Sequence, residues 1–525
     1  MTDNQAALAA SGVPTGPRRE ILIVLPGLLL TLIIAMLDQL VVSTALPRIV
    51  GDLGGLNHLA WVVTAYILAS TITTLFYGKL GDMYGRKRFL MIAIVLFLIG
   101  SALSGLAHSM DQLIAFRALQ GLGAGGLMVG AIATIGDMVS PRERGQYMGY
   151  MMAAMMLAMI AGPLVGGYIT QHWSWRWIFY INMPIGGAAL VYLWATLHLP
   201  RRRVEHKIDY LGATVIAVFS TAVVLLTSWG GSQYAWGSWE IIMLAVISAV
   251  ALAAFFVVES RAAEPMLPLH VFRNRNFSLA SAMSLLLGMA MLGALTFLPL
   301  YQQTVQHATP TSSGLALIPL MLGSTVTSLI AGQVTSKTGR YKILPIIGAV
   351  IMTLGLYLLT NLSVDTSRLT AALYFVVLGV GMGFLMQITS LIAQNSVPQR
   401  DMGVASSSRS FFQQIGGSLG VSLFGVIFFR RFADTMAAQL HTRQSFGSST
   451  SLDPATINRL PGAVKDAAFH AISTAISGVF WWTIPTTVAV FLLALVVKEI
   501  PLRGRSEPSP SQDQAPAEPQ LVHGA

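Results

Sequence analysis

The sequence predicts an all-α integral membrane protein with fourteen transmembrane helices, arranged as two six-helix bundles plus two inserted helices. Three observations lead to this fold class. Only 10% of the 525 residues are charged, whereas a soluble domain carries about 25% charged residues. Fourteen apolar runs approach or exceed the roughly 20 residues that a bilayer-crossing helix needs. Two glycine-rich landmarks also recur at one fixed spacing, which indicates an internal repeat.

The fourteen runs follow one another through mostly short polar connections. The first run is longer than the apolar core of a signal peptide, about 7–15 residues, so it is predicted to be a retained helix. Polar, Pro- and Ser-rich ends predict disorder at both termini. The helices are expected at 21–44, 59–80, 89–107, 112–136, 146–169, 177–199, 210–229, 239–258, 279–301, 314–335, 343–361, 370–394, 404–429 and 473–498.

The predicted domain organisation follows from these runs. The two halves are separated by the inserted pair of helices, and the second half carries the one sizeable outer loop. The expected parts are a disordered N-terminus (1–20), an N-terminal six-helix bundle (21–200), two inserted helices with a linker (201–275), a C-terminal six-helix bundle (276–500) with its outer loop (430–472), and a disordered tail (501–525).

The basic residues predict the orientation. An even number of spans places both termini on one side, and the basic connections GRKR (85–88), PRER (141–144), RRRVEHK (201–207) and SKTGRYK (336–342) share that side. Because cytoplasmic loops of membrane proteins are enriched in Lys and Arg, both termini are predicted to be cytoplasmic. The same dispersal argues against nucleic-acid binding despite the net charge of +10, since nucleic acids call for clustered basic faces.

The composition also limits the chemistry. The chain contains no cysteine, which excludes disulfides, thiolate metal sites and cysteine nucleophiles. We find no Walker motif, no His/Glu metal cluster and no supported Ser/His/Asp arrangement, so neither ATP nor a metal nor another cofactor is expected. The lack of cysteine and the Ala- and Gly-rich composition favour a bacterial source, and hence the bacterial inner membrane.

The repeat joins two pairs of landmarks. GKLGDMYGRKR (78–88) and GQVTSKTGRYK (332–342) share the spacing of two glycines and an arginine, and GPLVGG (162–167) is matched by GGSLGV (416–421). Both pairs are 254 residues apart, which indicates a duplicated six-helix unit. Internal repeats of this kind are typical of secondary transporters, which rock one half against the other. The residues that carry the first pair are Gly78, Gly85 and Arg86 and their counterparts Gly332, Gly339 and Arg340.

The charged loop at 78–88 can act as a lock. Its glycines allow tight turns and close helix approach, and its charges can form ion pairs that hold the cytoplasmic side in one state. The alternative is that GRKR only anchors the topology, and for Lys87 and Arg88 that alternative stays open. An anchor does not explain Asp82, because an acidic residue adds nothing to orientation.

Several motifs in order resemble the major facilitator superfamily. GKLGDMYGRKR resembles its motif A, LIAFRALQGLGAGG (113–126) its motif B, and LDQLVVSTALP (37–47), WRWIFYINMPIG (175–186) and LPLYQQ (298–303) are similar to its fourteen-helix drug:proton antiporter branch. The resemblance implies the major facilitator fold and alternating-access export of lipophilic drugs or antibiotics, driven by the proton gradient and conferring resistance. The residues that resemble antiporter motif C are Gly149, Ala158, Gly162, Pro163, Gly166 and Gly167, with Ala158 where glycine is usual.

Asp38 is the candidate proton carrier, since it is the one Asp or Glu placed well inside a predicted span. An ionisable residue within a membrane span is by default a functional candidate. Arg117 lies at a comparable depth, and the resemblance ties such an acid and the motif-B arginine to proton coupling. The alternative is a static ion pair that only joins two helices.

The resemblance further implies a cytoplasmic relay among Asp82, Arg86 and Asp137. Asp82 can also cap the helix at 404–429, where its charge meets the positive end of the helix dipole, and Arg409 is a candidate partner there. Methionines on the fifth helix suit an adaptable drug cavity, although lipid-facing positions explain them equally well. The candidate cavity residues are Met155, Tyr301, Gln302 and Gln387.

The partners expected are protons, membrane lipid and small lipophilic substrates that are neutral or monocationic. A monomer is expected, and the need for an adaptor protein stays open. One rival interpretation is an exporter of a native lipid or secondary metabolite with the same fold. An enzyme or a channel is disfavoured, because the sequence offers no catalytic constellation and no repeated pore-lining filter.

Overall fold

The computed structural model describes residues 18–53, 59–139, 141–198, 209–231, 233–262, 265, 267–306, 308, 310–398, 401–440 and 462–500. Within these ranges the chain forms helices and their connections, and the β-structure found there is an isolated bridge between Gly230 and Tyr234. The all-α prediction is therefore confirmed for the part of the chain that is described.

The helices fall into three groups along the chain. In the N-terminal half they are α2 (Arg18–Leu53), α3 (Leu59–Tyr84), α4 (Arg86–Gly105), α5 (Met110–Met138), α6 (Pro141–His172), α7 (Trp177–Tyr180) and α8 (Asn182–Thr196). The inserted pair is α9 (Tyr210–Trp229) and α10 (Trp239–Arg261). In the C-terminal half they are α11 (Leu269–Phe272), α12 (Arg275–Thr304), α13 (Pro310–Ala316), α14 (Ile318–Thr338), α15 (Ile343–Leu359), α16 (Arg368–Asn395), α17 (Met402–Leu440) and α19 (Gly462–Val496).

The helices match the fourteen predicted spans. Within the described residues, thirteen are long and apolar enough to cross a membrane, and α15 is a shorter apolar helix of 17 residues at the remaining predicted position. The predicted span at 177–199 is divided at Ile181 into α7 and α8. The predicted disordered N-terminus is too long, because α2 begins at Arg18; residues 1–17 and 501–525 lie outside the described residues.

The described parts of the predicted outer loop, 430–440 and 462–472, are helical and belong to the two long helices that flank it. Helix α17 continues to Leu440, and α19 begins at Gly462. The continuation of α17 has a physical reason: Phe428, Phe432 and Met436 recur every four residues and are buried in the core of the C-terminal half. Apolar side chains at this spacing continue one buried face of the helix. The helix therefore extends beyond the apolar run at 404–429 that hydropathy detects. Residues 441–461 of the predicted loop lie outside the described residues.

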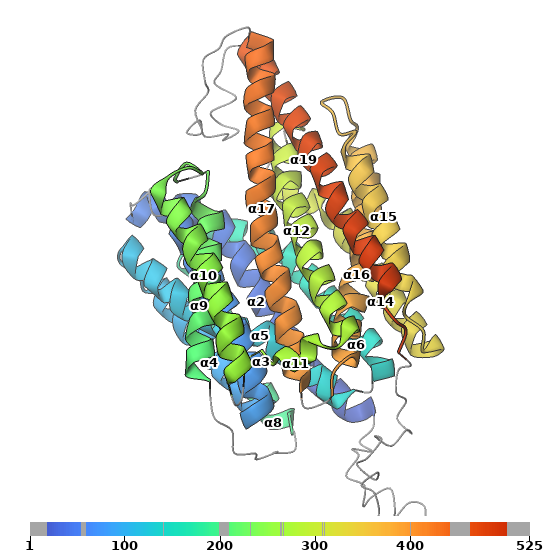
Figure 1. Cartoon of the computed structure of the whole chain (residues 1–525). Helices are drawn as coiled ribbons and strands as arrows, with labels where there is room; N and C mark the ends of the chain where they lie inside the picture. Colours follow the sequence, from blue (N-terminus) through green and yellow to red (C-terminus); the bar gives the residue numbers. More distant parts are fainter. Residues whose placement is uncertain are drawn as a thin grey trace, which may run out of the picture.

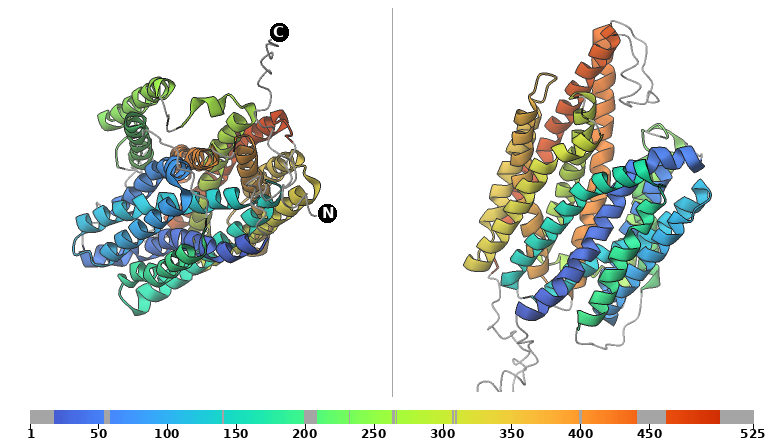
Figure 2. Two further views of the ribbon diagram at one scale, coloured as in Figure 1. Left: turned by 90° about the horizontal axis from the view of Figure 1, so that it is seen from below. Right: turned by 180° about the vertical axis from the view of Figure 1, so that it is seen from behind.

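The two halves repeat the same packing. Helix α5 packs against α3 and α4 in the N-terminal half, as α16 packs against α14 and α15 in the other. Likewise α2 packs against α6 and α8, as α12 packs against α17 and α19. The N-terminal and C-terminal bundles in Figures 1 and 2 are therefore built on one plan, which agrees with the repeat in the sequence.

Two helix pairs form the main contacts between the halves. Helix α3 packs against α17, and α6 packs against α14, so each half contributes its second and fifth helices to the interface. The halves diverge toward the upper end of Figure 1 and approach each other toward the lower end. The inserted helices lie beside the α3–α17 pair, where Leu75, Ile216, Phe255 and Phe411 share one buried apolar cluster.

Close helix crossings depend on glycine within each half. At the α4–α5 crossing, a methyl group added to Gly123 would lie 2.5 Å from the backbone oxygen of Ala93. At Gly187 of α8, a methyl group would meet no atom within 4 Å.

We therefore expect Gly123→Ala to lower the midpoint of thermal unfolding of the purified protein by several degrees. Overpacking of a tight contact costs about 1–3 kcal/mol. The control Gly187→Ala should leave the midpoint unchanged or slightly raise it, because alanine is the better helix former. Equal midpoints for the two variants would contradict the packing described at Gly123.

Candidate functional site

Asp38 lies in the middle of α2 and is completely buried. Its Oδ2 accepts a hydrogen bond from Arg117 Nη1 at 2.6 Å, and its Oδ1 accepts from Gln120 Nε2 and Asn182 Nδ2, each at 2.8 Å. The structure thus brings the predicted pair together and adds two amide donors. A carboxylate with three donors has its charge well compensated away from water.

Arg117 is held from several sides on α5. Its Nη1 also donates to Gln120 Oε1 at 2.8 Å, and its Nε donates to the backbone oxygen of Val62 at 3.4 Å. The guanidinium carbon lies 4.1 Å from the centre of the Tyr66 ring, close enough for a cation–π contact. A buried ion pair is tolerated when further hydrogen bonds satisfy both partners. The network therefore links α2, α3, α5 and α8.

Sequence reasoning missed the two amide donors. Gln120 lies three residues after Arg117, so it occupies the same helix face, and that spacing was a usable signal. Asn182 begins α8, far along the chain, and its Nδ2 also donates to Ser101 Oγ at 2.9 Å. No spacing rule connects Asn182 to Asp38, because only the packing of α8 on α2 and α4 brings it there.

A second charged cluster lies at the lower end of the interface between the halves. Asp82 on α3 contacts Arg86 Nη2 at 2.5 Å and accepts hydrogen bonds from the backbone nitrogens of Gly403 at 3.2 Å and Val404 at 2.9 Å. Arg86 also pairs with Asp137 at the end of α5. A carboxylate at the first turn of a helix satisfies free N–H groups and meets the positive end of the dipole. Asp82 therefore ties the N-terminal half directly to α17.

Glycines allow this close approach. A methyl group added to Gly78 would lie 2.7 Å from the backbone oxygen of Gly403, so α3 needs glycine there to contact α17. Gly85, between α3 and α4, has a φ of 101°, and its repeat counterpart Gly339 has a φ of 70°. Both angles favour glycine, which explains why the repeat keeps it. Of the other repeat counterparts, Gly332 is buried in α14 and Arg340 is exposed.

The other basic residues of this region have separate partners. Lys87 Nζ donates to the backbone oxygen of Trp194 at 2.7 Å near the end of α8, whereas Arg88 is exposed. Arg144, which sequence reasoning missed, donates to the backbone oxygens of Gly136 at 2.7 Å and Val139 at 3.2 Å. Burial lowers the pKa of Arg144 to about 10, although nearby Asp137 acts in the opposite direction. Its bonds fasten the start of α6 to the end of α5.

The antiporter-motif residues lie on α6, which touches both halves. A methyl group added to Gly162 would lie 2.6 Å from Leu40 Cβ of α2, and one added to Gly149 would lie 2.5 Å from Leu329 Cδ2 of α14. The helix runs unbroken through Pro163. The remaining motif residues are Ala158, which is completely buried, Gly166, whose oxygen accepts from Thr170 Oγ1 at 2.5 Å, and Gly167, which has open space around it.

Arg409 is not a partner of Asp82, contrary to the prediction. No hydrogen bond or ion pair joins Arg409 to any residue that the structure describes, and only 5% of it is exposed. The reason is helical phase. Asp82 and Gly78 meet α17 at Gly403 and Ser407, whereas Arg409 shares the α12-facing side of α17 with Gly416.

The four predicted cavity residues do not come together. Tyr301 is completely buried at the upper end of α12, and its hydroxyl donates to the backbone oxygen of Ser363 at 2.8 Å. The neighbouring Gln302 is also buried, and Gln387 on α16 accepts from Ser328 Oγ at 3.2 Å. Met155 lies on α6 in the other half. Tyr301 and Gln387 therefore serve internal hydrogen bonds of the C-terminal half in this conformation.

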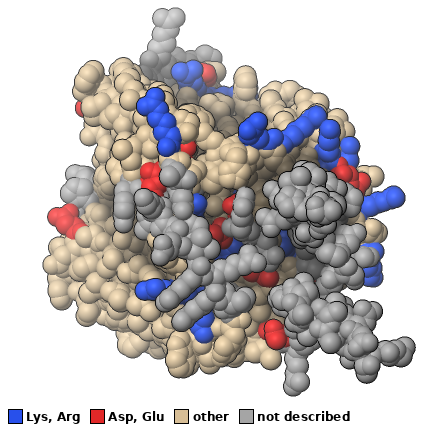
Figure 3. Space-filling view, turned by 60° about the horizontal axis from the view of Figure 1, so that its bottom comes forward, with Lys and Arg blue, Asp and Glu red and all other residues tan. Residues whose placement is uncertain are grey.

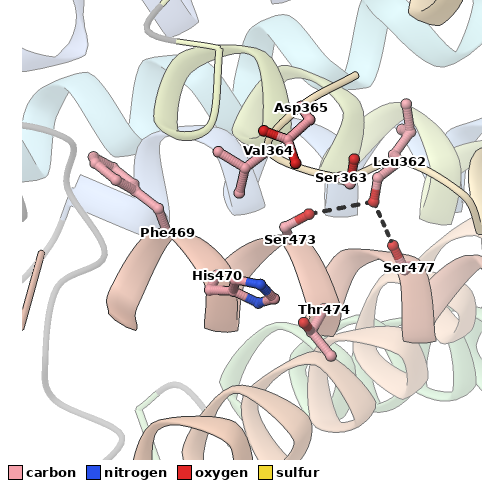
Figure 4. Close-up of a pocket in the computed structure, with 9 residues that line it drawn as sticks. All are labelled: Leu362, Ser363, Val364, Asp365, Phe469, His470, Ser473, Thr474 and Ser477. Carbon is pink, nitrogen blue, oxygen red and sulfur yellow. Dashed lines mark hydrogen bonds between the residues drawn. The ribbon is translucent and has the colours of Figure 1, made fainter. Parts of the chain in front are cut away.

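A cavity of about 470 Å³ lies at the upper end of the C-terminal half. Figure 4 shows the residues that line it. It lies between α19 and the connection from α15 to α16, where Ser473 and Ser477 donate to the backbone oxygen of Leu362 at 3.2 and 2.9 Å. Asp365 and His470 also line it. None of the four residues predicted for a substrate cavity is among its lining residues.

Comparisons with known proteins agree with this architecture. The family model described as Major Facilitator Superfamily matches residues 28–421. An uncharacterized MFS-type transporter of Mycobacterium tuberculosis is 38% identical over 501 residues, covering 95% of this chain and 73% of the relative. Multidrug resistance protein 3 of Bacillus subtilis is 35% identical, covering 86% and 90%. The multidrug transporter protein MdtP of the same organism is 36% identical, covering 81% and 78%.

Solved structures show the same fold at low sequence identity. The human organic anion transporter TETRAN superposes with a TM-score of 0.59 at 12% identity, covering 91% of this chain and 99% of its own. The proton:xylose symporter XylE superposes with a TM-score of 0.58 at 14% identity, covering 89% and 96%. The predicted major facilitator fold is therefore confirmed.

The geometry at Asp82 yields a prediction. We expect Asp82→Asn to let the lower ends of the halves separate, because it removes charge-assisted hydrogen bonds worth about 1.5–3 kcal/mol each. Spin labels on cysteines introduced at the exposed Leu22 and Ile343 report the lower distance. Since the chain has no cysteine of its own, only these two sites react.

In Asp82→Asn, the share of molecules with a longer label-to-label distance should rise about tenfold or more, since 1.4 kcal/mol corresponds to a factor of about ten. The control Asp111→Asn removes an exposed carboxylate at the start of α5 and should keep the wild-type distribution. An unchanged distribution in Asp82→Asn would show that the Asp82 cap does not hold the halves together.

Proposed function

The chain belongs to the major facilitator superfamily, and from this premise we propose that it is a proton-coupled secondary active exporter of lipophilic drugs or antibiotics. In this proposal it works by alternating access and confers resistance. Membership makes it a multi-pass membrane transporter. Export is supported by the names of its relatives, since two Bacillus subtilis proteins that cover most of this chain are a multidrug transporter and a multidrug resistance protein.

The observation that carries the proposal is the buried network around Asp38. A proton-driven exporter needs a group within the membrane that gains and loses a proton as the protein changes state. When Asp38 is charged, Arg117, Gln120 and Asn182 all donate to it. A protonated Asp38 would lose the charge-assisted contact, while Arg117 would keep its bond to Gln120 and its place over the Tyr66 ring.

The proposed coupling follows from that difference. Four helices meet at Asp38, so a change in its charge changes the balance of contacts among α2, α3, α5 and α8. Proton uptake would take place when the site is open to the outside, and proton release when it is open to the cytoplasm. Cargo would use the same open states in the opposite direction, which is the definition of antiport.

The lower charged cluster serves as the gate in this proposal. Exposed basic residues lie at the lower end, among them Arg88, Arg273, Lys337 and Arg340, and Lys and Arg side chains surround this face in Figure 3. The positive-inside rule then makes the lower side cytoplasmic, with both termini on it. Because the halves meet at this side, the conformation is the outward-facing one. Opening to the cytoplasm must break the contact between Asp82 and α17.

The proposal extends to the location, oligomeric state, cargo and energy source of the protein. We place the protein in the inner membrane of a bacterium, acting as a monomer on small lipophilic molecules that are neutral or carry one positive charge. The proton gradient supplies the energy, so no cofactor is needed. A second carboxylate inside the spans of the C-terminal half would suit dicationic cargo, but its sequence offers none within the predicted spans.

The central test uses proteoliposomes with an imposed pH gradient, following ethidium movement and internal pH together. Wild type should move ethidium only when the gradient is present, with matched proton flux. Asp38→Asn should reduce both fluxes at least a hundredfold, because the amide cannot carry the proton. The control Asp365→Asn changes an exposed outer carboxylate and should keep both fluxes.

Gradient-driven transport in Asp38→Asn would place the coupling site elsewhere. Ethidium movement by wild type without any gradient would refute proton coupling itself. If wild type never moves ethidium but shows proton flux with another lipophilic cation, coupling stands and the cargo class is narrower.

A further inference from the structure

Arg409 is a buried cation in the C-terminal half, and it has no counter-charge among the residues that the structure describes. It lies two turns into α17, and 5% of it is exposed. Its Nε is buried and has no hydrogen-bond partner, and no ion pair reaches it from the described residues. Arginine stays protonated in proteins, so burial cannot be relieved by loss of the proton. Buried charges are normally paired, which means that Arg409 calls for a partner.

The packing of α12 on α17 defines what surrounds Arg409. The two helices lie side by side in Figure 1, with Gly288 against Gln413 and Gly416 against Leu285. Arg409 precedes Gln413 by one turn on the same face of α17. Ser281 precedes Leu285 by one turn on the facing side of α12. Arg409 and Ser281 therefore lie at neighbouring levels of one interface.

Three buried hydroxyl groups without partners lie at this level. Ser281 Oγ, Ser410 Oγ and Thr389 Oγ1 are all buried, and none has a hydrogen-bond partner among the described residues. Thr389 belongs to α16, which runs antiparallel to α17 and is joined to it by the bond from Gln394 to Ser406. Thr389 is five residues before Gln394 and Ser410 is four residues after Ser406, so the two residues lie at similar levels of the bundle. Three helices thus carry unpaired hydroxyl donors at the level of Arg409.

The hydrogen-bond donors of Arg409 and of the three hydroxyl groups indicate which class of ligand could bind. A guanidinium presents a planar fork of N–H groups that matches the two oxygens of a carboxylate or of a phosphate, and hydroxyls donate to the remaining lone pairs. Among the described residues no carboxylate is paired with Arg409: Asp82 and Asp137 contact Arg86, and Asp401 contacts His270. A cation or an apolar molecule would leave the same donors unsatisfied.

We propose that Arg409, Ser281, Thr389 and Ser410, the Arg409 cluster, form an oxyanion-binding site in the C-terminal half. The oxyanion is either the carboxylate of an organic acid or a free inorganic anion, and the two share the same contacts. The site goes beyond the proposed export of neutral and monocationic molecules, since such cargo has no group for it. It also lies in the half opposite to Asp38, so it does not depend on proton coupling there.

The test measures binding by calorimetry, with the full-length protein in lipid nanodiscs. Benzoate is the organic-acid probe, benzamide its neutral isostere, and inorganic phosphate the free-anion probe. Wild type should bind benzoate or phosphate but not benzamide. Arg409→Gln should weaken that binding about tenfold or more, since the lost charge-assisted bonds correspond to at least that factor. The matched control Arg430→Gln removes an exposed arginine of the same helix and should bind as wild type does.

The possible outcomes distinguish an organic acid from a free inorganic anion, and they also include results that overturn the proposal. Benzoate binding without phosphate binding assigns an organic acid, and phosphate binding assigns a free anion. No anion binding by wild type, or equal binding by Arg409→Gln, overturns the proposal. If Arg409→Gln does not fold, Ser281→Ala and Ser410→Ala should each weaken binding a few-fold, and unchanged affinity in both also overturns it. Asp38→Asn should bind the anion as wild type does, so failure of the exporter proposal would leave this result unaffected.

Discussion

The burial of charge in an apolar bundle is the constraint on which the rest of this structure depends. A carboxylate in the middle of α2 is tolerable only if donors surround it, and those donors must come from neighbouring helices. Arg117, Gln120 and Asn182 supply them from α5 and α8, and Tyr66 on α3 covers the guanidinium. The electrostatic requirement of one side chain therefore fixes how four helices pack.

The same constraint gives Asp82 two tasks at once. Within its own half it pairs with Arg86, and across the interface it satisfies the first backbone N–H groups of α17. A contact that serves both halves cannot be kept when they separate at that end. Asp38 and Asp82 thus lie at different depths of the N-terminal half, and α3 and α5 contribute to both of their networks. Because these helices are closely packed through glycine, a shift of one helix at one depth would move its neighbours at the other.

The sequence predicts the fold well because hydropathy, basic loops and a fixed repeat are properties of the chain itself. It also predicts the pairing of Asp38 with Arg117 and the contact of Asp82 with α17, since few charged residues lie in or near the spans. It does not reveal Asn182, because that contact depends on how α8 crosses α2. It overestimates the outer loop, where Phe432 and Met436 extend a helix beyond the apolar run. The sequence wrongly assigns Arg409 as a partner of Asp82 and Tyr301 to a substrate cavity. The position of a residue along a span gives its depth in the membrane, but it does not show which neighbouring helix its side chain faces.

The inserted helices have a consequence for how molecules dissolved in the bilayer reach the space between the halves. Two seams run along the interface, one between α3 and α17 and one between α6 and α14. The pair α9 and α10 covers the first seam with an apolar cluster that includes Phe255 and Phe411. Among the described residues no comparable helix pair covers the second. In the proposed exporter, a molecule dissolved in lipid would therefore enter through the α6–α14 seam, which is lined in part by Gly149 and Leu329.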